Sequence, residues 1–245
     1  MMKKGSLFQR MAAAPHIVWM IMFIVAPMLF VLYFAFTDSA GNFSFSNILS
    51  LSQYSNVFIL SIAFALIATV VCLIIGYPLA YFMSRTKPKT QKILMVLIML
   101  PMWCNLLIRT YALMALLDNG GLLNAFLESL GLDKVYIVGS DAGVILGMVY
   151  DFLPYMVLPI FTTMSKLDKK YLEAAHDLGC NSIQTMTKVI MPLTVSGVIS
   201  GVTMVFVPSI STFYISQKLG AGKIDLIGDT IERLFKNPST YNVGA

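Results

Sequence analysis

Five long apolar runs dominate the chain, at about residues 16–37, 57–84, 93–117, 142–164 and 189–215. A helix needs about 20 predominantly apolar residues to cross the hydrocarbon core of a bilayer. Only 12% of the residues are charged, about half the share of a typical soluble domain. Backbone polar groups inside lipid must bond within the protein, which favours α-helices. We therefore expect an all-α, polytopic membrane protein whose residues 1–245 form a single transmembrane domain.

The positions of the basic residues predict how these helices are oriented. Eleven of the 17 lysines and arginines lie before the first run, between the second and third, or between the fourth and fifth. The alternate loops, 38–56 and 118–141, carry only Lys134. Cytoplasmic loops are enriched in Lys and Arg, which places the N-terminus and residues 165–188 in the cytoplasm. The net charge of +5 then follows from topology, which argues against nucleic-acid binding.

The segment between the fourth and fifth runs is polar and carries helix-capping signals. Asp168 can cap a short helix, and Gly179 suits the left-handed position that ends one. Asn181 and Gln184 have the spacing of a capping box. Pro192 lies where the chain enters the fifth run, where a missing backbone donor is tolerated. Two short cytoplasmic helices over residues 168–188 are predicted, and the residues alone fit either a connecting loop or a docking surface.

Five residues of this segment share the spacing of a known motif. Glu173, Ala174 and Ala175, then Gly179, and a Val-x-Met-Pro sequence ending at Pro192 resemble the EAA motif of ABC importer permeases, EAA-x3-G-x9-I-x-LP. Val and Met stand in the places of the usual Ile and Leu. The resemblance implies that these five residues belong to coupling helices that dock into a groove of a cytoplasmic ATPase.

Longer stretches are similar to the permeases of spermidine/putrescine importers, of the PotB type. They are 100–111, 147–159, 166–169 and 208–235, so the similarity covers nearly the whole chain. The resemblance implies the type I importer permease (MetI-like) fold and a subunit that forms half of the pathway of an ATP-driven polyamine importer. The family has a further transmembrane helix after an external loop, here 216–245. We expect that last helix to be absent from these 245 residues.

The same resemblance implies three kinds of partner: a cytoplasmic ABC ATPase dimer, a second permease subunit in a heterodimer, and an extracytoplasmic polyamine-binding protein. The chain has no Walker motif. We therefore expect ATP and Mg²⁺ on the partner ATPase, no cofactor or metal on this chain, and no enzymatic activity of its own. The expected location is a bacterial cell membrane. The alternatives are a related importer permease for another small solute, a truncated non-transporting subunit, and a self-sufficient secondary transporter.

Asp151 is the only acidic residue well inside an apolar run. An ionisable residue within the membrane is a functional candidate by default. Polyamines are polycations, which carboxylates and aromatic faces attract. We expect Asp151 to line the pathway as a transient counter-charge, and a carboxylate bonded to a neighbouring helix is the alternative. The expected aromatic faces of the pathway are Trp103, Tyr150, Tyr155, Phe213 and Tyr214.

Other residues of the apolar runs lead to weaker expectations. Arg109, near the outer end of the third run, is expected to snorkel to the headgroups, to meet a binding protein, or to pair with Asp118. Prolines in the third to fifth runs free backbone carbonyls and predict interrupted or bent helices. These prolines are Pro101, Pro154, Pro159 and Pro208.

Overall fold

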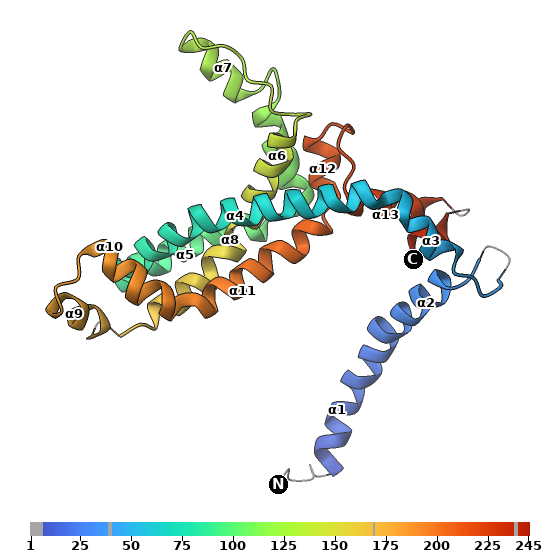
Figure 1. The fold of residues 1–245 in the computed structure, drawn as a ribbon, viewed down its shortest axis with the longest axis horizontal. Helices are drawn as coiled ribbons and strands as arrows, with labels where there is room; N and C mark the ends of the chain where they lie inside the picture. The colour runs from blue at the N-terminus through green and yellow to red at the C-terminus, as the bar shows by residue number, and fades with distance from the viewer. Residues whose placement is uncertain (1–6, 39–40, 169, 238–239) are drawn as a thin grey trace. The chain divides into compact units, whose positions relative to one another are not determined.

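The structure is a computed structural model, which describes residues 7–38, 41–168, 170–237 and 240–245. Every named element within these ranges is helical, and one isolated bridge joins Thr37 to Phe43. The expected all-α fold class is confirmed. The chain divides into two compact units, the first made of residues 1–56 and 230–245 and the second of residues 57–229 (Figure 1).

The first unit combines the N-terminal helix with the end of the chain. The helix runs through α1 (Leu7–Met20), a π-helical turn (Ile21–Val25) and α2 (Ala26–Ala35). The Tyr241 ring packs edge-on against Phe34, with ring centroids 5.0 Å apart. The Asn242 amide donates a 2.6 Å hydrogen bond to the Thr37 carbonyl. The unit also holds α3 (Ser46–Ser50), a 3-10 turn (Leu51–Tyr54), most of α13 (Ile227–Lys236) and α14 (Tyr241–Gly244).

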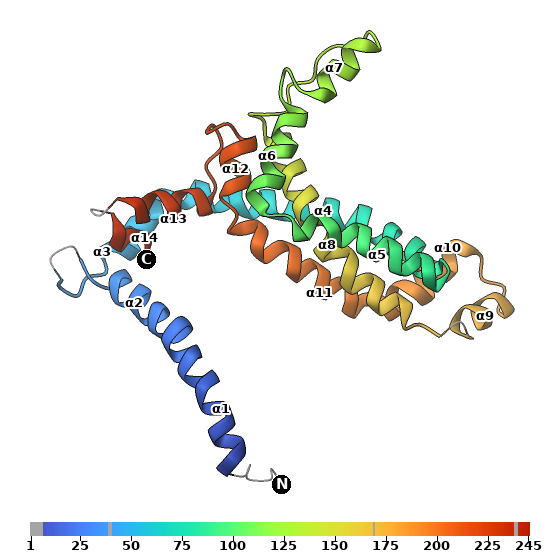
Figure 2. The ribbon, with the colours of Figure 1, turned by 180° about the vertical axis from the view of Figure 1, so that it is seen from behind.

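The second unit is a bundle in which α4, α5, α8 and α11 run alongside one another (Figures 1 and 2). Its core is formed by buried apolar side chains that include Cys72 of α4, Met148 and Met156 of α8, and Val205 of α11. The helices are α4 (Ser55–Arg85), α5 (Pro88–Trp103), α6 (Leu106–Leu117), α7 (Leu122–Ser129), α8 (Asp141–Ser165), α9 (Lys170–Asp177), α10 (Ser182–Thr185), a π-helical turn (Met186–Ile190), α11 (Met191–Ile210) and α12 (Tyr214–Leu219).

Two glycines allow α8 and α11 to pack closely. Gly197 and Gly201 are four residues apart and face α8. A Cβ atom built at Gly197 would lie 2.9 Å from the Pro159 carbonyl oxygen, and one at Gly201 would lie 2.8 Å from the Met156 sulfur. Small residues with this spacing let helix backbones approach within membranes, where packing rather than apolar burial drives association. The pattern is present in the sequence, although the apolar runs alone do not single it out.

Within the described residues, five helical stretches are long and apolar enough to cross a membrane. They are Ala14–Ala35, Ser46–Arg85, Leu106–Ser129, Asp141–Ser165 and Ser182–Ile210. The third differs most from the expected run at 93–117, because α5 ends at Trp103 and α6 begins at Leu106. Cys104 is extended, and the Asn105 side chain accepts a 2.8 Å hydrogen bond from the Leu107 N–H, which caps α6.

The two prolines of the fourth run do not end their helix. Pro154 and Pro159 lie inside α8, and Pro208 lies inside α11. Pro101 and Pro208 each lie two residues before the end of their helix, which is Trp103 for α5 and Ile210 for α11. The fifth helix stops at Ile210, short of the expected residue 215, and the chain turns there into α12. That short turn brings α12 back against α6 and α8 in the second unit.

Candidate functional site

The helix α9, which holds the EAA residues, is capped at both ends. The Lys170 N–H donates a 3.1 Å hydrogen bond to Asp168 Oδ1 at its start. At its end Gly179 has a φ of +76°, as its position in the sequence predicts. The Gly179 N–H bonds to the His176 carbonyl at 2.9 Å, and the Cys180 N–H bonds to the Ala175 carbonyl at 3.0 Å. This bond pattern is a Schellman motif, which ends a helix at a defined residue.

A second set of caps fixes the start of α10. The Gln184 N–H donates to the Asn181 side chain at 2.8 Å, and the Asn181 N–H donates to the Gln184 side chain at 3.0 Å. The predicted capping box is therefore confirmed. From Ser182 the chain stays helical to Ile210, and Pro192 lies in the first turn of α11 just after the π-helical turn. The α10 helix is thus continuous with a candidate membrane helix.

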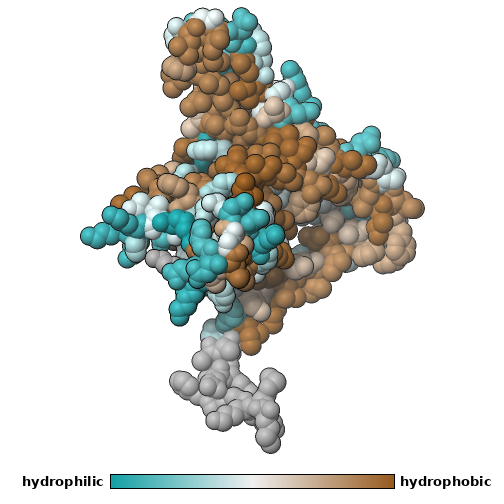
Figure 3. All heavy atoms as spheres, turned by 60° about the vertical axis from the view of Figure 1, so that its left-hand side comes forward, coloured by the Kyte–Doolittle hydropathy of each residue, from teal (hydrophilic) through white to brown (hydrophobic). Residues whose placement is uncertain are grey.

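The EAA residues face two directions. Ala175 is buried, and the neighbouring Leu172 packs on the core of the second unit. Glu173 and Ala174 are exposed. Three apolar side chains on or next to α9 and α10 are exposed as well: Tyr171 (54%), Leu178 (84%) and Ile183 (75%). Figure 3 turns the end that carries α9 and α10 toward the viewer, and hydrophilic side chains gather there. The site thus offers apolar side chains and a carboxylate within a polar surface.

A buried ion pair lies between α6 and α8. The Asp151 carboxylate, 1% exposed, contacts the Arg109 guanidinium, 8% exposed. Thr110 Oγ1 lies 3.5 Å from Asp151 Oδ2, and Arg109 Nη1 donates a 3.1 Å hydrogen bond to the carbonyl of Pro101. The Arg109 guanidinium carbon also lies 6.0 Å from the centre of the Tyr150 ring. Arg109 therefore connects α6, on which it lies, to the end of α5 through Pro101 and to α8 through Asp151.

This pair corrects the expectations for Arg109. The side chain is buried instead of snorkelling, and its ionic partner is Asp151 instead of Asp118. The sequence does not reveal the pair, because the two residues lie on different apolar runs. The Asp151 carboxylate is bonded to a neighbouring helix, which is the alternative weighed for it. Its role as a counter-charge in the pathway stays a prediction.

The aromatic residues expected to line the pathway are spread over several elements. Trp103 is 73% exposed at the end of α5. Tyr150 lies by the ion pair, and Tyr155 packs near Phe152 on α8. Tyr214 lies instead beside Tyr111, a residue that the sequence did not single out as a site residue. Phe213, 40% exposed, is the residue before α12.

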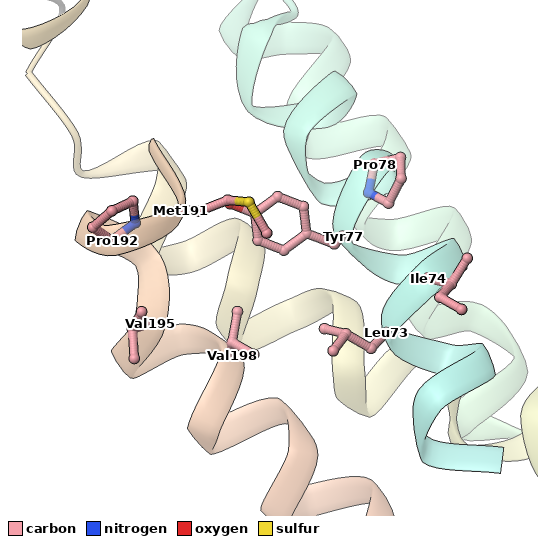
Figure 4. A pocket seen from close by; sticks show the side chains of 8 residues that line it. All are labelled: Leu73, Ile74, Tyr77, Pro78, Met191, Pro192, Val195 and Val198. Atoms are coloured by element: carbon pink, nitrogen blue, oxygen red, sulfur yellow. The ribbon is translucent and has the colours of Figure 1, made fainter. Parts of the chain in front are cut away.

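A cavity of about 670 Å³ lies between α4 and α11 (Figure 4). None of its lining residues carries a charge. The Tyr77 hydroxyl on its wall bonds to Thr194 Oγ1 at 2.9 Å, which leaves the hydroxyl already partnered. Among the described lining residues, Tyr77 is the one aromatic residue and no carboxylate lies beside it, so this cavity suits an apolar group better than a polycation. The lining residues are Leu73, Ile74, Tyr77, Pro78, Met191, Pro192, Val195 and Val198.

A known protein family matches most of this second unit. The family is described as "Binding-protein-dependent transport system inner membrane component", and its profile matches residues 76–234. The chain belongs to this family. As an inner membrane component of a binding-protein-dependent transport system it is a multi-pass transport subunit, in agreement with the five candidate spans.

Curated relatives of this inner membrane component extend over nearly the whole chain. The spermidine/putrescine transport system permease protein PotB of Haemophilus influenzae is 37% identical over 238 residues, covering 93% of this chain and 83% of the relative. PotB of Escherichia coli is 36% identical over 237 residues, covering 93% and 86%. The resemblance to permeases of this type is confirmed.

A solved structure supports the fold of this transport component. The crystal structure of a bacterial alginate ABC transporter, in complex with an alginate pentasaccharide-bound periplasmic protein, contains a chain that matches with a TM-score of 0.76. The match covers 97% of this chain and 86% of the other, at 20% sequence identity. The expected type I importer permease fold is confirmed.

Proposed function

We propose that this chain is the membrane-spanning subunit of an ATP-driven importer whose cargo is a polyamine of the spermidine and putrescine class. The observation that carries the proposal is the sequence identity of 35–37% to spermidine/putrescine permeases over 93–100% of the chain. The subunit forms half of the pathway with a second permease. An extracytoplasmic binding protein delivers the cargo, and the N-terminus lies in the cytoplasm.

The helices α9 and α10 serve as the contact with the cytoplasmic ATPase. Their caps hold the backbone in one conformation, which lowers the entropy lost on docking. Leu178 and Ile183 offer apolar area to a groove, and Glu173 offers a carboxylate at its side. ATP and Mg²⁺ bind to the partner, and this chain performs no catalytic chemistry of its own.

The helix geometry supplies a route from the ATPase to the membrane. A displacement of α10 moves α11 because the helix is continuous from Ser182 to Ile210. The close contacts at Gly197 and Gly201 then pass that movement to α8. Packed helices transmit displacement because close-packed interiors have low compressibility.

The pathway residues remain part of this proposal. The Asp151 charge is balanced by Arg109, so Asp151 attracts a polycation only when the pair opens. Aromatic faces attract a polycation without opening of this ion pair. We therefore give the aromatic residues, with Tyr150 and Tyr214 foremost, the larger part in guiding the cargo, and Trp103, Tyr155 and Phe213 a smaller one.

Transport by the complete assembly tests this function. The chain is reconstituted in lipid vesicles with its ATPase, second permease and binding protein, and uptake of labelled spermidine is measured with competing solutes. The proposal predicts saturable, ATP-dependent uptake that excess putrescine reduces and excess maltose or glutamate does not. Uptake of an uncharged or acidic solute with no uptake of either polyamine would overturn it, and would identify a related importer for another solute.

A further inference from the structure

A lysine of this chain lies against two tyrosine rings in the second unit. Tyr111 of α6 and Tyr214 of α12 meet edge to face, with ring centroids 5.9 Å apart. The Lys218 ammonium lies 5.0 Å from the centre of the Tyr111 ring and 5.7 Å from that of Tyr214. A cation within about 6 Å of an aromatic centroid is attracted by the ring quadrupole. The two rings thus hold one primary ammonium group.

The group they hold is chemically the end of a polyamine. Beyond its Cα atom a lysine is a flexible four-carbon stem that ends in an ammonium group. Putrescine consists of the same stem with an ammonium at each end, and spermidine carries the same aminobutyl arm. A site that accepts the Lys218 side chain therefore has the dimensions and the faces that accept this arm.

We propose that Tyr111 and Tyr214 form an ammonium subsite on the cargo pathway, and that Lys218 occupies it until a polyamine terminus displaces it. The subsite itself rests on the geometry of these three residues, and its cargo rests on the proposed function. Neither Tyr111 nor Lys218 was singled out from the sequence as part of a site.

The position of the three residues allows such an exchange. Tyr111 is 46% exposed, and Tyr214 and Lys218 are half-buried, so the ring faces can be reached from outside the core. Lys218 lies near the end of α12, just before a turn in which Gly222 has a φ of +71°. Its long side chain can leave the rings by changing rotamers, without movement of the helix.

An occupied subsite suits transport better than an empty one. Conduction through a membrane protein requires binding that is strong enough to admit the cargo and weak enough to release it. When one primary ammonium replaces another, the cation–π attraction gained by the cargo nearly equals the attraction lost by Lys218. The cation–π attraction therefore largely cancels in the exchange, and the returning lysine helps to release the cargo.

Binding of n-butylammonium to the complete complex in nanodiscs, followed by ligand-observed NMR titration, tests the subsite. The variant Lys218→Gln removes the resident ammonium and is expected to bind the probe about tenfold more tightly. Adding Tyr111→Leu to it should abolish the gain, whereas adding Tyr111→Phe, which keeps a ring, should preserve it. Lys223→Gln, three residues after Gly220 in the same loop region, is the matched control and should leave probe binding unchanged.

Two outcomes would overturn the subsite: unchanged probe affinity in Lys218→Gln, or a gain that persists when Tyr111→Leu is added. Either would leave Lys218 as a contact that only joins α12 to α6. The uptake assay separates this result from the proposed function. If spermidine is imported but the affinity for the probe does not depend on Tyr111, the proposed subsite alone is wrong. If the probe responds as expected but no polyamine is imported, the proposed cargo alone is wrong.

Discussion

The Asp151 carboxylate of α8 and the Arg109 guanidinium of α6 form an ion pair that is almost fully buried. When two opposite charges are buried together, their mutual attraction offsets much of the cost of removing them from water. A single buried charge has no such compensation. The pair therefore gives Asp151 a structural role in addition to any role in the pathway. It also joins the broken third run to α8, since Arg109 bonds the Pro101 carbonyl as well.

We expect Asp151→Asn to lower the free energy of unfolding by about 3–5 kcal/mol, because Arg109 would be left buried without its counter-charge. The double variant Arg109→Met, Asp151→Leu should lose much less stability, because it leaves no buried charge unpaired. Denaturant unfolding in detergent measures both. Spermidine uptake by the double variant adds a second readout: a stable double variant that still transports shows that Asp151 is not needed as a counter-charge.

Gly179→Ala should weaken the association with the ATPase. A residue with a side chain at a φ of +76° is strained by about 1 kcal/mol, which disturbs the end of α9. Gly222→Ala is the matched control, because Gly222 has a φ of +71° and, like Gly179, no atom within 4 Å of an added Cβ. Co-purification of the ATPase is compared for both variants. Equal loss in both would show that backbone strain, and not the position of Gly179 after α9, causes the effect.

Gly197→Ala should destabilise the second unit by about 1–3 kcal/mol, because overpacking a tight contact forces helices apart. The added Cβ would lie 2.9 Å from a backbone oxygen of α8, which cannot move aside as a side chain can. Gly120→Ala adds the same atom where nothing lies within 4 Å and should leave the melting temperature unchanged. A Gly197→Ala variant as stable as the wild type would contradict the close packing of α8 and α11.

We expect the free energy of unfolding to depend on pH because of the buried carboxyl of Asp229. Its Oδ2 accepts hydrogen bonds from Ser216 Oγ at 2.6 Å and the Leu226 N–H at 2.9 Å. Burial nevertheless raises the pKa of this carboxyl above its usual value, and the two hydrogen bonds oppose that shift only in part. The folded chain therefore keeps the proton to a higher pH than the unfolded chain, and stability falls as pH rises from about 4, the ordinary Asp pKa, through the raised pKa.

Asp229→Asn removes this ionisation and should flatten that part of the profile. The comparison is the unfolding free energy of the wild type and the variant from pH 4 to pH 8. The wild type should lose stability relative to the variant as pH rises, and the difference should become constant above the raised pKa. A difference that does not change with pH would show that Asp229 titrates alike in both states.

The sequence predicted what depends on local chemistry. Long apolar runs indicated the membrane helices, and the left-handed Gly179 and the capping box at Asn181 followed from the residues at those positions. The Arg109–Asp151 pair and the Tyr111–Lys218 contact could not be predicted, because they depend on how α6 packs against α8 and α12. Pro101 predicts an interruption of the third run, but the exact place of the break after Trp103 depends on the capping side chain of Asn105, which an apolar run does not record.

ATP hydrolysis by the complete complex in vesicles tests most directly whether this chain couples polyamine import to an ATPase. We expect that spermidine-loaded binding protein stimulates hydrolysis by the assembled wild-type complex, and that Glu173→Ala in α9 reduces the stimulation while hydrolysis by the isolated ATPase is unaffected. Hydrolysis that is the same with and without spermidine-loaded binding protein, in a complex shown to be fully assembled, would contradict it.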